Sequence, residues 1–299
     1  MPSSPEIAVP TRRLFLPGAP GRIRAGAVSA ARTAGPAEVA ALVLLSLLIV
    51  AAIVGPMLSP YSGIIPSGAA HRPPLSAGHL LGTDDLGLDI GTRVLLGTRT
   101  SLFAALVVTA LSAFAGLVIG TLAGFAGGVL DNVLMRVTDL FLALPATIVA
   151  MAIAAGLGPG LGSSMIGIAV VWWPLYARLV RGEVRRAAGS LHVEAARIGG
   201  TKGLRLVVRH VLPSVLPTVA VTASLDVGGV IVTVAALSFV GLGSSAPAPE
   251  LGLMAAAGLQ YLVTSWWIPI IPGVCVGLLS LLFNYTGDGL RAVLRAKGA

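Results

Sequence analysis

Charged residues, aromatic residues and cysteine are all scarce in this 299-residue sequence. Only 11% of the residues are charged and 5% are aromatic, whereas 56% are hydrophobic. A soluble domain usually carries about 25% charged residues, so this composition excludes an ordinary soluble protein. The single cysteine, Cys275, excludes an intrachain disulfide and a cysteine-based zinc site. The four histidines show no ligand spacing such as HExxH, and we expect no metal site.

The scarce charges are mostly positive, with 20 Lys and Arg against 12 Asp and Glu. A basic chain can indicate nucleic-acid binding. Here the arginines flank apolar runs and do not alternate with aromatic residues, as the positive-inside rule predicts for a membrane protein. We therefore expect membrane lipid around the chain and no nucleic-acid partner.

Long apolar runs predict an all-α membrane protein with six transmembrane helices. Each run is close to the roughly 20 residues that a helix needs to cross a bilayer. The segment before the first run is rich in Pro, Gly, Ala and Arg, which predicts a mobile tail. The predicted spans are 37–58, 100–125, 133–156, 164–182, 213–240 and 267–287. The predicted organisation is a tail over 1–36, a first helix over 37–58, an extracytoplasmic segment over 59–97, a core with five further spans over 98–292 and a C-terminal tail over 293–299.

The distribution of Lys and Arg predicts the orientation. With six spans and an inside N-terminus, 17 of the 20 basic residues lie in cytoplasmic segments. The reverse orientation would place most of the positive charge outside, which the positive-inside rule disfavours. Both termini are therefore expected in the cytoplasm.

The segment between the fourth and fifth spans predicts two short amphipathic helices. Leu191, Ala195 and Ile198 have the i, i+4, i+7 spacing of one helix face, and Gly199-Gly200 ends that helix. A second stripe comprises Leu204, Val207, Val208 and Val211. The spacing alone leaves two alternatives open for these apolar faces, which are the bilayer surface and a groove on a cytoplasmic partner.

The same segment resembles the EAA loop of ABC-importer permeases. It contains Glu194-Ala195-Ala196, Gly200 after three residues, and Leu212-Pro213 at the expected distance, although His210 replaces the usual aliphatic residue. The run His79-Leu80-Leu81-Gly82-Thr83-Asp84-Asp85-Leu86-Gly87 resembles the signature of the C-type permeases of dipeptide, oligopeptide and nickel importers. Further matching runs are Asp139–Pro145, Ala236–Gly243 and Phe283–Arg291, so the resemblance covers about residues 38–292.

This resemblance implies a type I ABC-importer permease fold with cytoplasmic coupling helices. The partners that it implies are a homologous permease subunit in a heterodimer, separate cytoplasmic ATPase subunits and an extracytoplasmic substrate-binding protein. The coupling loop would span about 187–212, and its implied contact residues are Leu191, Glu194, Ala195, Ala196, Arg197, Ile198, Gly200 and Leu204. The chain lacks the G-x-x-x-x-G-K-[ST] phosphate loop. ATP and Mg²⁺ would therefore be bound by the ATPase partners, and this chain would be a transporter subunit with no cofactor and no catalytic residues.

The implied function is import of di- or oligopeptides by alternating access, with nickel chelates or haem as alternative cargo. Asp226, Ser238, Phe239 and Asn284 are the candidate residues of the translocation path. Val234 and Leu251 depart from the usual glutamate and tryptophan of the family near that expected path. An ion-coupled secondary transporter or channel that uses Asp226 is the alternative from another class.

Three features have both a functional and a structural interpretation. Asp226, in the middle of the fifth span, could line the path and meet a peptide amino terminus, or it could pair with a neighbouring helix. Gly116, Gly120 and Gly124 predict close backbone packing, either within the chain or at a subunit interface. The group Asp84, Asp85, Asp89 and Arg93 could bind a ligand, but a turn and a helix cap are favoured.

Overall fold

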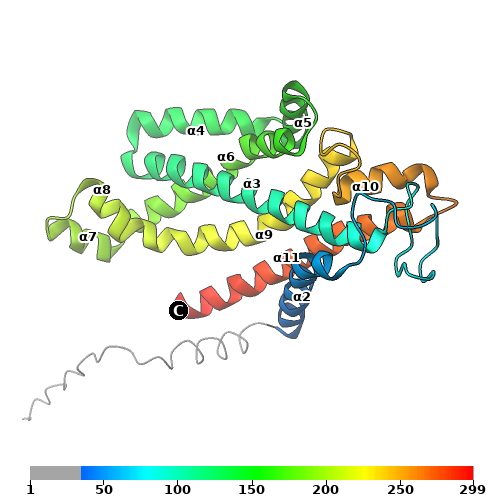
Figure 1. Ribbon diagram of the computed structural model, residues 1–299. Helices are drawn as coiled ribbons and strands as arrows, with labels where there is room; N and C mark the ends of the chain where they lie inside the picture. Colours follow the sequence, from blue (N-terminus) through cyan, green and yellow to red (C-terminus); the bar gives the residue numbers. More distant parts are fainter. Residues whose placement is uncertain (1–34, 299) are drawn as a thin grey trace, which may run out of the picture.

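The computed structural model describes residues 35–298, and side chains over 35–292. The tail predicted over 1–36 therefore falls almost wholly outside the described residues. The described part of the chain is helical and contains no strands, only two isolated bridges within the segment that joins the first two helices (Figure 1). The elements are α2 (Pro36–Leu58), α3 (Ile90–Ala126), α4 (Gly128–Ala143), α5 (Ala146–Leu157), α6 (Leu161–Ala188), α7 (Leu191–Ile198), α8 (Gly203–Leu206), the π-helix η1 (Val207–Val211), α9 (Leu212–Phe239), α10 (Leu251–Gly258), the 3₁₀ helix η2 (Leu259–Tyr261) and α11 (Trp267–Gly298).

Five of these helices are long and apolar enough to cross a membrane. They are α2, α3, α6, the continuous stretch Gly203–Phe239 and α11. The pair α4 and α5 brings the number to six if it counts as one span, but the two helices are bent by 89°. The third span predicted over 133–156 is therefore not one continuous helix but falls on this bent pair. Pro145 explains the break, because it lacks an N–H group and disfavours helical geometry at Leu144, whose ψ of 146° is extended.

Several helices extend beyond the predicted spans. α3 begins at Ile90 and not at residue 100, because the Asp89 side chain accepts a hydrogen bond from the Thr92 amide and caps the helix there. The segment predicted over 59–97 therefore loses its last eight residues to α3. α11 continues as backbone helix to Gly298, beyond the predicted end of the sixth span and through the predicted C-terminal tail.

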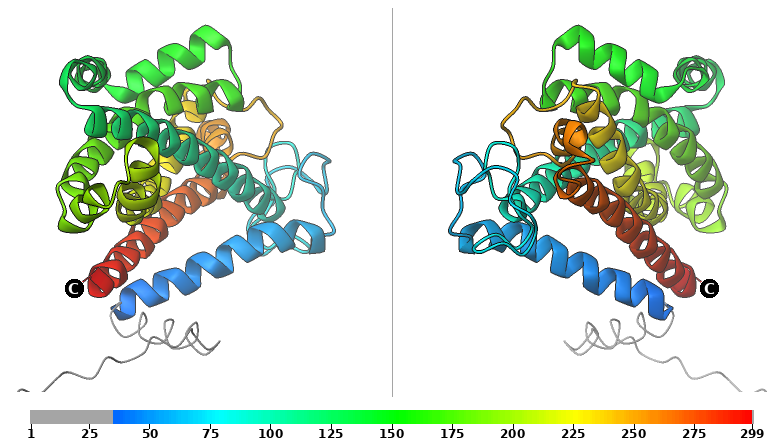
Figure 2. Two further views of the ribbon diagram at one scale, coloured as in Figure 1. Left: turned by 90° about the vertical axis from the view of Figure 1, so that its left-hand side faces the viewer. Right: turned by 90° about the vertical axis from the view of Figure 1, so that its right-hand side faces the viewer.

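The α3–α6 pair is the most extensive contact of the fold, and α9 packs on both of these helices and on α11. α2 lies beside α11 and α3 at the edge of the bundle (Figure 2). The molecule has two ends. One end carries α7 and α8, and the other carries α10 and the segment before α3 (Figure 1). We call these the α7 end and the α10 end.

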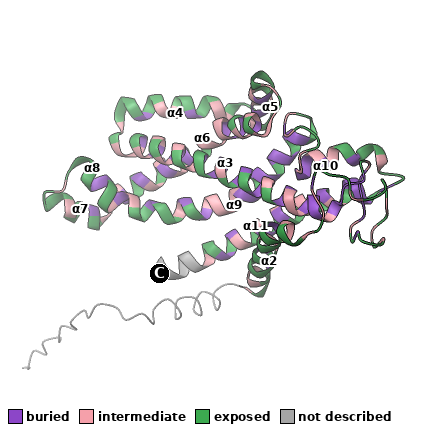
Figure 3. Cartoon of the chain, viewed as in Figure 1, coloured by how far each residue is buried: buried purple, intermediate pink, exposed green. Residues whose placement is uncertain are grey.

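The core is built from small and branched apolar side chains. Val108 of α3, Ile168 of α6 and Ile231 of α9 are fully buried where these three helices meet. The outer surfaces of α2, α4 and α5 are mostly exposed, as the green ribbon shows in Figure 3. Exposed apolar helix surfaces of this kind are expected where lipid surrounds the protein.

Candidate functional site

The residues predicted to couple to an ATPase form the tip of the α7 end (Figure 1). α7 begins after Ser190 and ends before Gly199, as the spacing predicted. Its anchor is Val193, which is fully buried in a cluster that includes Val180 and Val184 of α6. Gly200 has a φ of 88°, so it supplies the left-handed turn that reverses the chain after α7.

The predicted stripe of α7 points away from the rest of the chain. Leu191 is 90% exposed and Ile198 is 82% exposed, and Ala195 between them is also exposed. Glu194 and Arg197 are exposed as well, and Ala196 is half-buried. The stripe is thus free of contacts within the described part of the chain and leaves an apolar surface for a partner.

The second predicted stripe is only partly correct. Val207 and Val211 are buried as one face, but Val208 is exposed and Leu204 is 78% exposed beside the α7 surface. Leu206, which the pattern did not select, is buried instead. The reason is the π-helical turn over Val207–Val211, which rotates the residues before it relative to a regular helix. Pro213, which has no N–H group to donate, follows this wide turn after Leu212.

The four residues predicted to line the translocation path do not form one site. Asn284 of α11 lies beside Gly228 of α9, two residues beyond Asp226. Ser238 is 99% buried against the turn that follows α9, whereas Phe239 is 46% exposed. Asn284 thus lies on the side of α9 that meets α11, whereas the other two residues lie at the far end of α9.

Asp226 is half-buried on α9, and its carboxyl faces α6. The polar groups opposite are the Tyr176 hydroxyl and the Trp172 indole nitrogen, both buried and without a hydrogen-bond partner among the described residues. This arrangement favours the interpretation in which Asp226 pairs with a neighbouring helix of its own chain.

Val234 and Leu251 are both fully buried in the core of the chain. Leu251 packs against Gly97 of α3, where an added Cβ would lie 3.1 Å from the leucine Cδ2. Neither side chain reaches an accessible surface of the described chain, and their position near the path stays a prediction.

The glycine repeat of α3 packs within the chain. A Cβ added at Gly116, Gly120 or Gly124 would lie within 3.0 Å of backbone or Cβ atoms of α6. Small residues allow two helix backbones to approach this closely. The alternative of a subunit interface is therefore not needed to explain the repeat.

The acidic group before α3 forms a turn and a cap, as favoured from the sequence. Asp89 accepts from the Thr92 amide at 2.7 Å and lies 2.9 Å from the Nδ1 atom of His79. Asp84 accepts from the amides of Leu86 and Leu88 and lies 3.5 Å from Arg93. Burial raises the pKa of Asp84, whereas the Leu88 amide and Arg93 act in the opposite direction.

Two polar arrangements were not predicted from the sequence. Asp131 of α4 is buried and forms ion pairs with Arg181 and Arg185 of α6. Glu250 is fully buried and caps α10 by accepting from the amides of Gly252 and Leu253. The partners of Asp131 lie 50 and 54 residues away, so no local spacing identifies them. Glu250 did carry a local signal, because acidic residues are enriched at the starts of helices and an apolar run follows it.

Comparison with known proteins places this geometry in a family. Residues 116–297 match the family described as the inner membrane component of binding-protein-dependent transport systems. A probable D,D-dipeptide transport system permease protein (DdpC) of Escherichia coli K12 is 38% identical over 262 residues, which is 88% of each chain. The dipeptide transport system permease protein DppC of the same strain is 42% identical over 222 residues, 74% of each chain.

Among solved structures, the MetNI methionine ABC transporter in an inward-facing conformation is similar, with a TM-score of 0.54. The sequence identity is 22%, and the match covers 67% of this chain and 95% of the other. At this identity the match shows the fold, which is that of a type I importer permease, in agreement with the prediction. The chain therefore belongs to the family of inner-membrane permease components of binding-protein-dependent transport systems.

Proposed function

We propose that this chain is one half of the permease of an ATP-driven importer that carries di- or oligopeptides into the cytoplasm. The second half is a homologous permease subunit, and two ATPase subunits bind ATP and Mg²⁺ and hydrolyse the nucleotide. An extracytoplasmic binding protein delivers the cargo. This chain itself changes no covalent bond, and it alternates between outward-facing and inward-facing states.

The observation that carries the proposal is the apolar surface at the α7 end. Leu191, Ile198 and Leu204 are each more than three-quarters exposed at the tip of a helical segment that continues into α9. An amphipathic helix of this kind docks by placing its apolar side chains in a groove of a partner. A displacement of α7 by the ATPase would be transmitted to the membrane spans through Val193, because this side chain is buried in one cluster with residues of α6 and η1.

The proposed orientation places the α7 end and both termini in the cytoplasm. The start of α2 and the last part of α11 lie at the same end of the molecule, because Gly289 approaches the side chain of Glu38. Arg178, Arg181, Arg185 and Arg186 also lie in the part of α6 that leads to α7. Their position supports an inside location for this end.

Charge introduced on the apolar surface tests the ATPase contact. In the purified importer, Leu191→Glu and Ile198→Glu should each reduce recovery of the ATPase subunits with the tagged permease. They should also lower cargo-stimulated ATP hydrolysis about tenfold, as expected when a buried apolar contact is replaced by an unpaired charge. Leu191→Met is the matched control, because it keeps an apolar side chain of similar size. Normal recovery and hydrolysis in both charged variants would refute the docking surface.

Peptide cargo is proposed from the two relatives named as dipeptide and D,D-dipeptide permeases. Uptake of a radiolabelled dipeptide should depend on the complete importer, ATP and the binding protein in proteoliposomes. Nickel chelates and haem are the competing cargo and are measured in parallel. Saturable uptake of either competitor with no uptake of peptides would reject the peptide assignment and retain the importer.

A further inference from the structure

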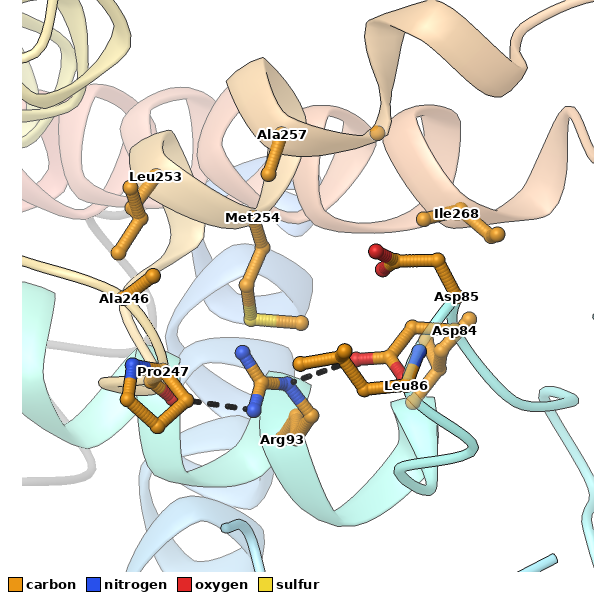
Figure 4. Close-up of a pocket in the computed structure, with 12 residues that line it drawn as sticks. Asp84, Asp85, Leu86, Arg93, Ala246, Pro247, Leu253, Met254, Ala257 and Ile268 are labelled. Atoms are coloured by element: carbon orange, nitrogen blue, oxygen red, sulfur yellow. Dashed lines mark hydrogen bonds and ion pairs between the residues drawn. The ribbon is translucent and has the colours of Figure 1, made fainter. Parts of the chain in front are cut away.

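A small cavity lies at the α10 end, between the segment before α3, the α10 region and α11 (Figure 4). Its volume is about 110 Å³. The charged groups that line it are the carboxylates of Asp84 and Asp85 and the guanidinium of Arg93, and its apolar wall includes Met254, Leu253 and Ile268. It is far from α7 and shares no residue with the predicted coupling loop or path.

Asp85 differs from the other two acidic residues of this segment, because its side chain accepts no hydrogen bond from the backbone of the described residues. Asp84 bonds two backbone amides, and Asp89 caps α3. The Asp85 carboxylate is half-exposed, and its one hydrogen bond among the described residues is a long one, from the Tyr261 hydroxyl at 3.5 Å. It therefore retains acceptor capacity for a ligand.

Arg93 is held rigidly at the opposite side of the cavity. Its side chain is only 7% exposed, and its Nη1 atom donates to the carbonyls of Gly63 and Pro247 at 2.8 and 3.1 Å. Nε faces Asp84 at 3.5 Å. Nη2 forms no hydrogen bond with another residue in the part of the chain that the structure describes, and it faces the Met254 side chain, which also lines the cavity (Figure 4). Nε is the Arg93 nitrogen that is buried without a hydrogen-bond partner among the described residues, and a buried donor of this kind is costly unless a ligand supplies an acceptor at that edge of the guanidinium.

We propose that this cavity is an entry subsite for the amino-terminal residue of a peptide. The ammonium group binds Asp85, the first peptide carbonyl accepts from Nη2 of Arg93, and the first side chain packs against Met254 and Ile268. The other possible occupant is a lysine side chain of a protein that docks at this end of the molecule. Its ammonium group could also bind Asp85, but it fits the cavity less well because it offers no carbonyl oxygen to accept from Nη2 of Arg93. The inference rests on the proposed function, which brings peptides to this end of the molecule.

The test uses the purified permease and ATPase complex in nanodiscs, without the binding protein, so that any discrimination comes from the membrane subunits. Equilibrium binding of radiolabelled Ala-Phe is measured for the wild type and for Asp85→Asn, with unlabelled Ala-Phe and N-acetyl-Ala-Phe as competitors. We expect saturable binding that only the free-amino peptide displaces. Asp85→Asn should weaken it about tenfold, as expected for loss of one charge-assisted hydrogen bond. Tyr261→Phe keeps the carboxylate and should change binding less than about twofold.

Equal binding of Ala-Phe by the wild type and Asp85→Asn, or displacement by both competitors alike, would overturn the inference. So would an absence of saturable binding in the wild type. A variant that keeps peptide binding but loses affinity for the binding protein would assign the cavity to protein docking instead. Uptake by the complete wild-type importer is measured alongside. Peptide uptake that is indifferent to Asp85→Asn refutes the subsite alone, whereas no peptide uptake by the wild type refutes the proposed function.

Discussion

The backbone contact between α3 and α6 makes a specific prediction for Gly120. A Cβ added at this position would lie 2.5 Å from the Ala177 carbonyl oxygen and 2.7 Å from the Val180 Cβ. Ordinary contact begins at 3.4 Å, and neither atom can rotate away because one is backbone and the other is fixed to it. Gly120→Ala therefore requires the two helices to separate by about 1 Å, which is overpacking of a well-filled contact.

The expected cost follows from two opposing effects. Overpacking costs about 1–3 kcal/mol, and alanine regains up to about 1 kcal/mol over glycine within a helix. Because neither contact atom can move, we place the overpacking cost in the upper part of its range, so the net loss is about 1–2 kcal/mol and the thermal midpoint of the complex falls by roughly 2–8 °C. Fluorescence-detected size-exclusion chromatography after heating measures this midpoint in detergent.

Gly182→Ala is the matched control on α6 itself. No atom lies within 4 Å of a Cβ built at Gly182, and the residue is exposed. Its midpoint should stay the same or rise slightly. A Gly120→Ala midpoint equal to that of Gly182→Ala would refute the close α3–α6 contact. In that case the glycine repeat would again need another explanation, such as a subunit interface.

Two further predictions concern the polar groups that the sequence did not identify. Asp131→Asn should lower the thermal midpoint, at a cost of about 1–3 kcal/mol for weakened bonds to Arg181 and Arg185. Asp139→Asn, whose ion pair with Arg178 is exposed, should change the midpoint little, and equal effects of the two variants would contradict this assignment. Glu250→Ala should cost about 0.5–2 kcal/mol through loss of the α10 cap. Limited proteolysis near α10 measures this loss, and cleavage no faster than in the wild type would show that the cap is dispensable.

The sequence by itself determined the class of protein and the location of most helices. Apolar length is enough for this, because a bilayer requires about 20 apolar residues per span and satisfied backbone hydrogen bonds in each. Local spacing was also sufficient for α7, whose predicted stripe is Leu191, Ala195 and Ile198, and for the cap at Asp89. These features depend on residues within two turns of one another.

The tertiary structure was needed for every feature that depends on contacts between residues far apart in the chain or on changes in helix direction. Periodicity could not show that α4 and α5 meet at 89°, or that Leu204 is exposed while Leu206 is buried, because a proline and a π-helical turn change the direction of the helix. It also could not assign the glycine repeat of α3 to α6 or give Asp131 its arginine partners, which lie 50 or more residues away. At the acidic group before α3, residue types alone predicted a turn and a cap. Only the packing of α10 and α11 over Asp85 and Arg93 formed a cavity there, because a cavity requires walls from segments that are far apart in the chain.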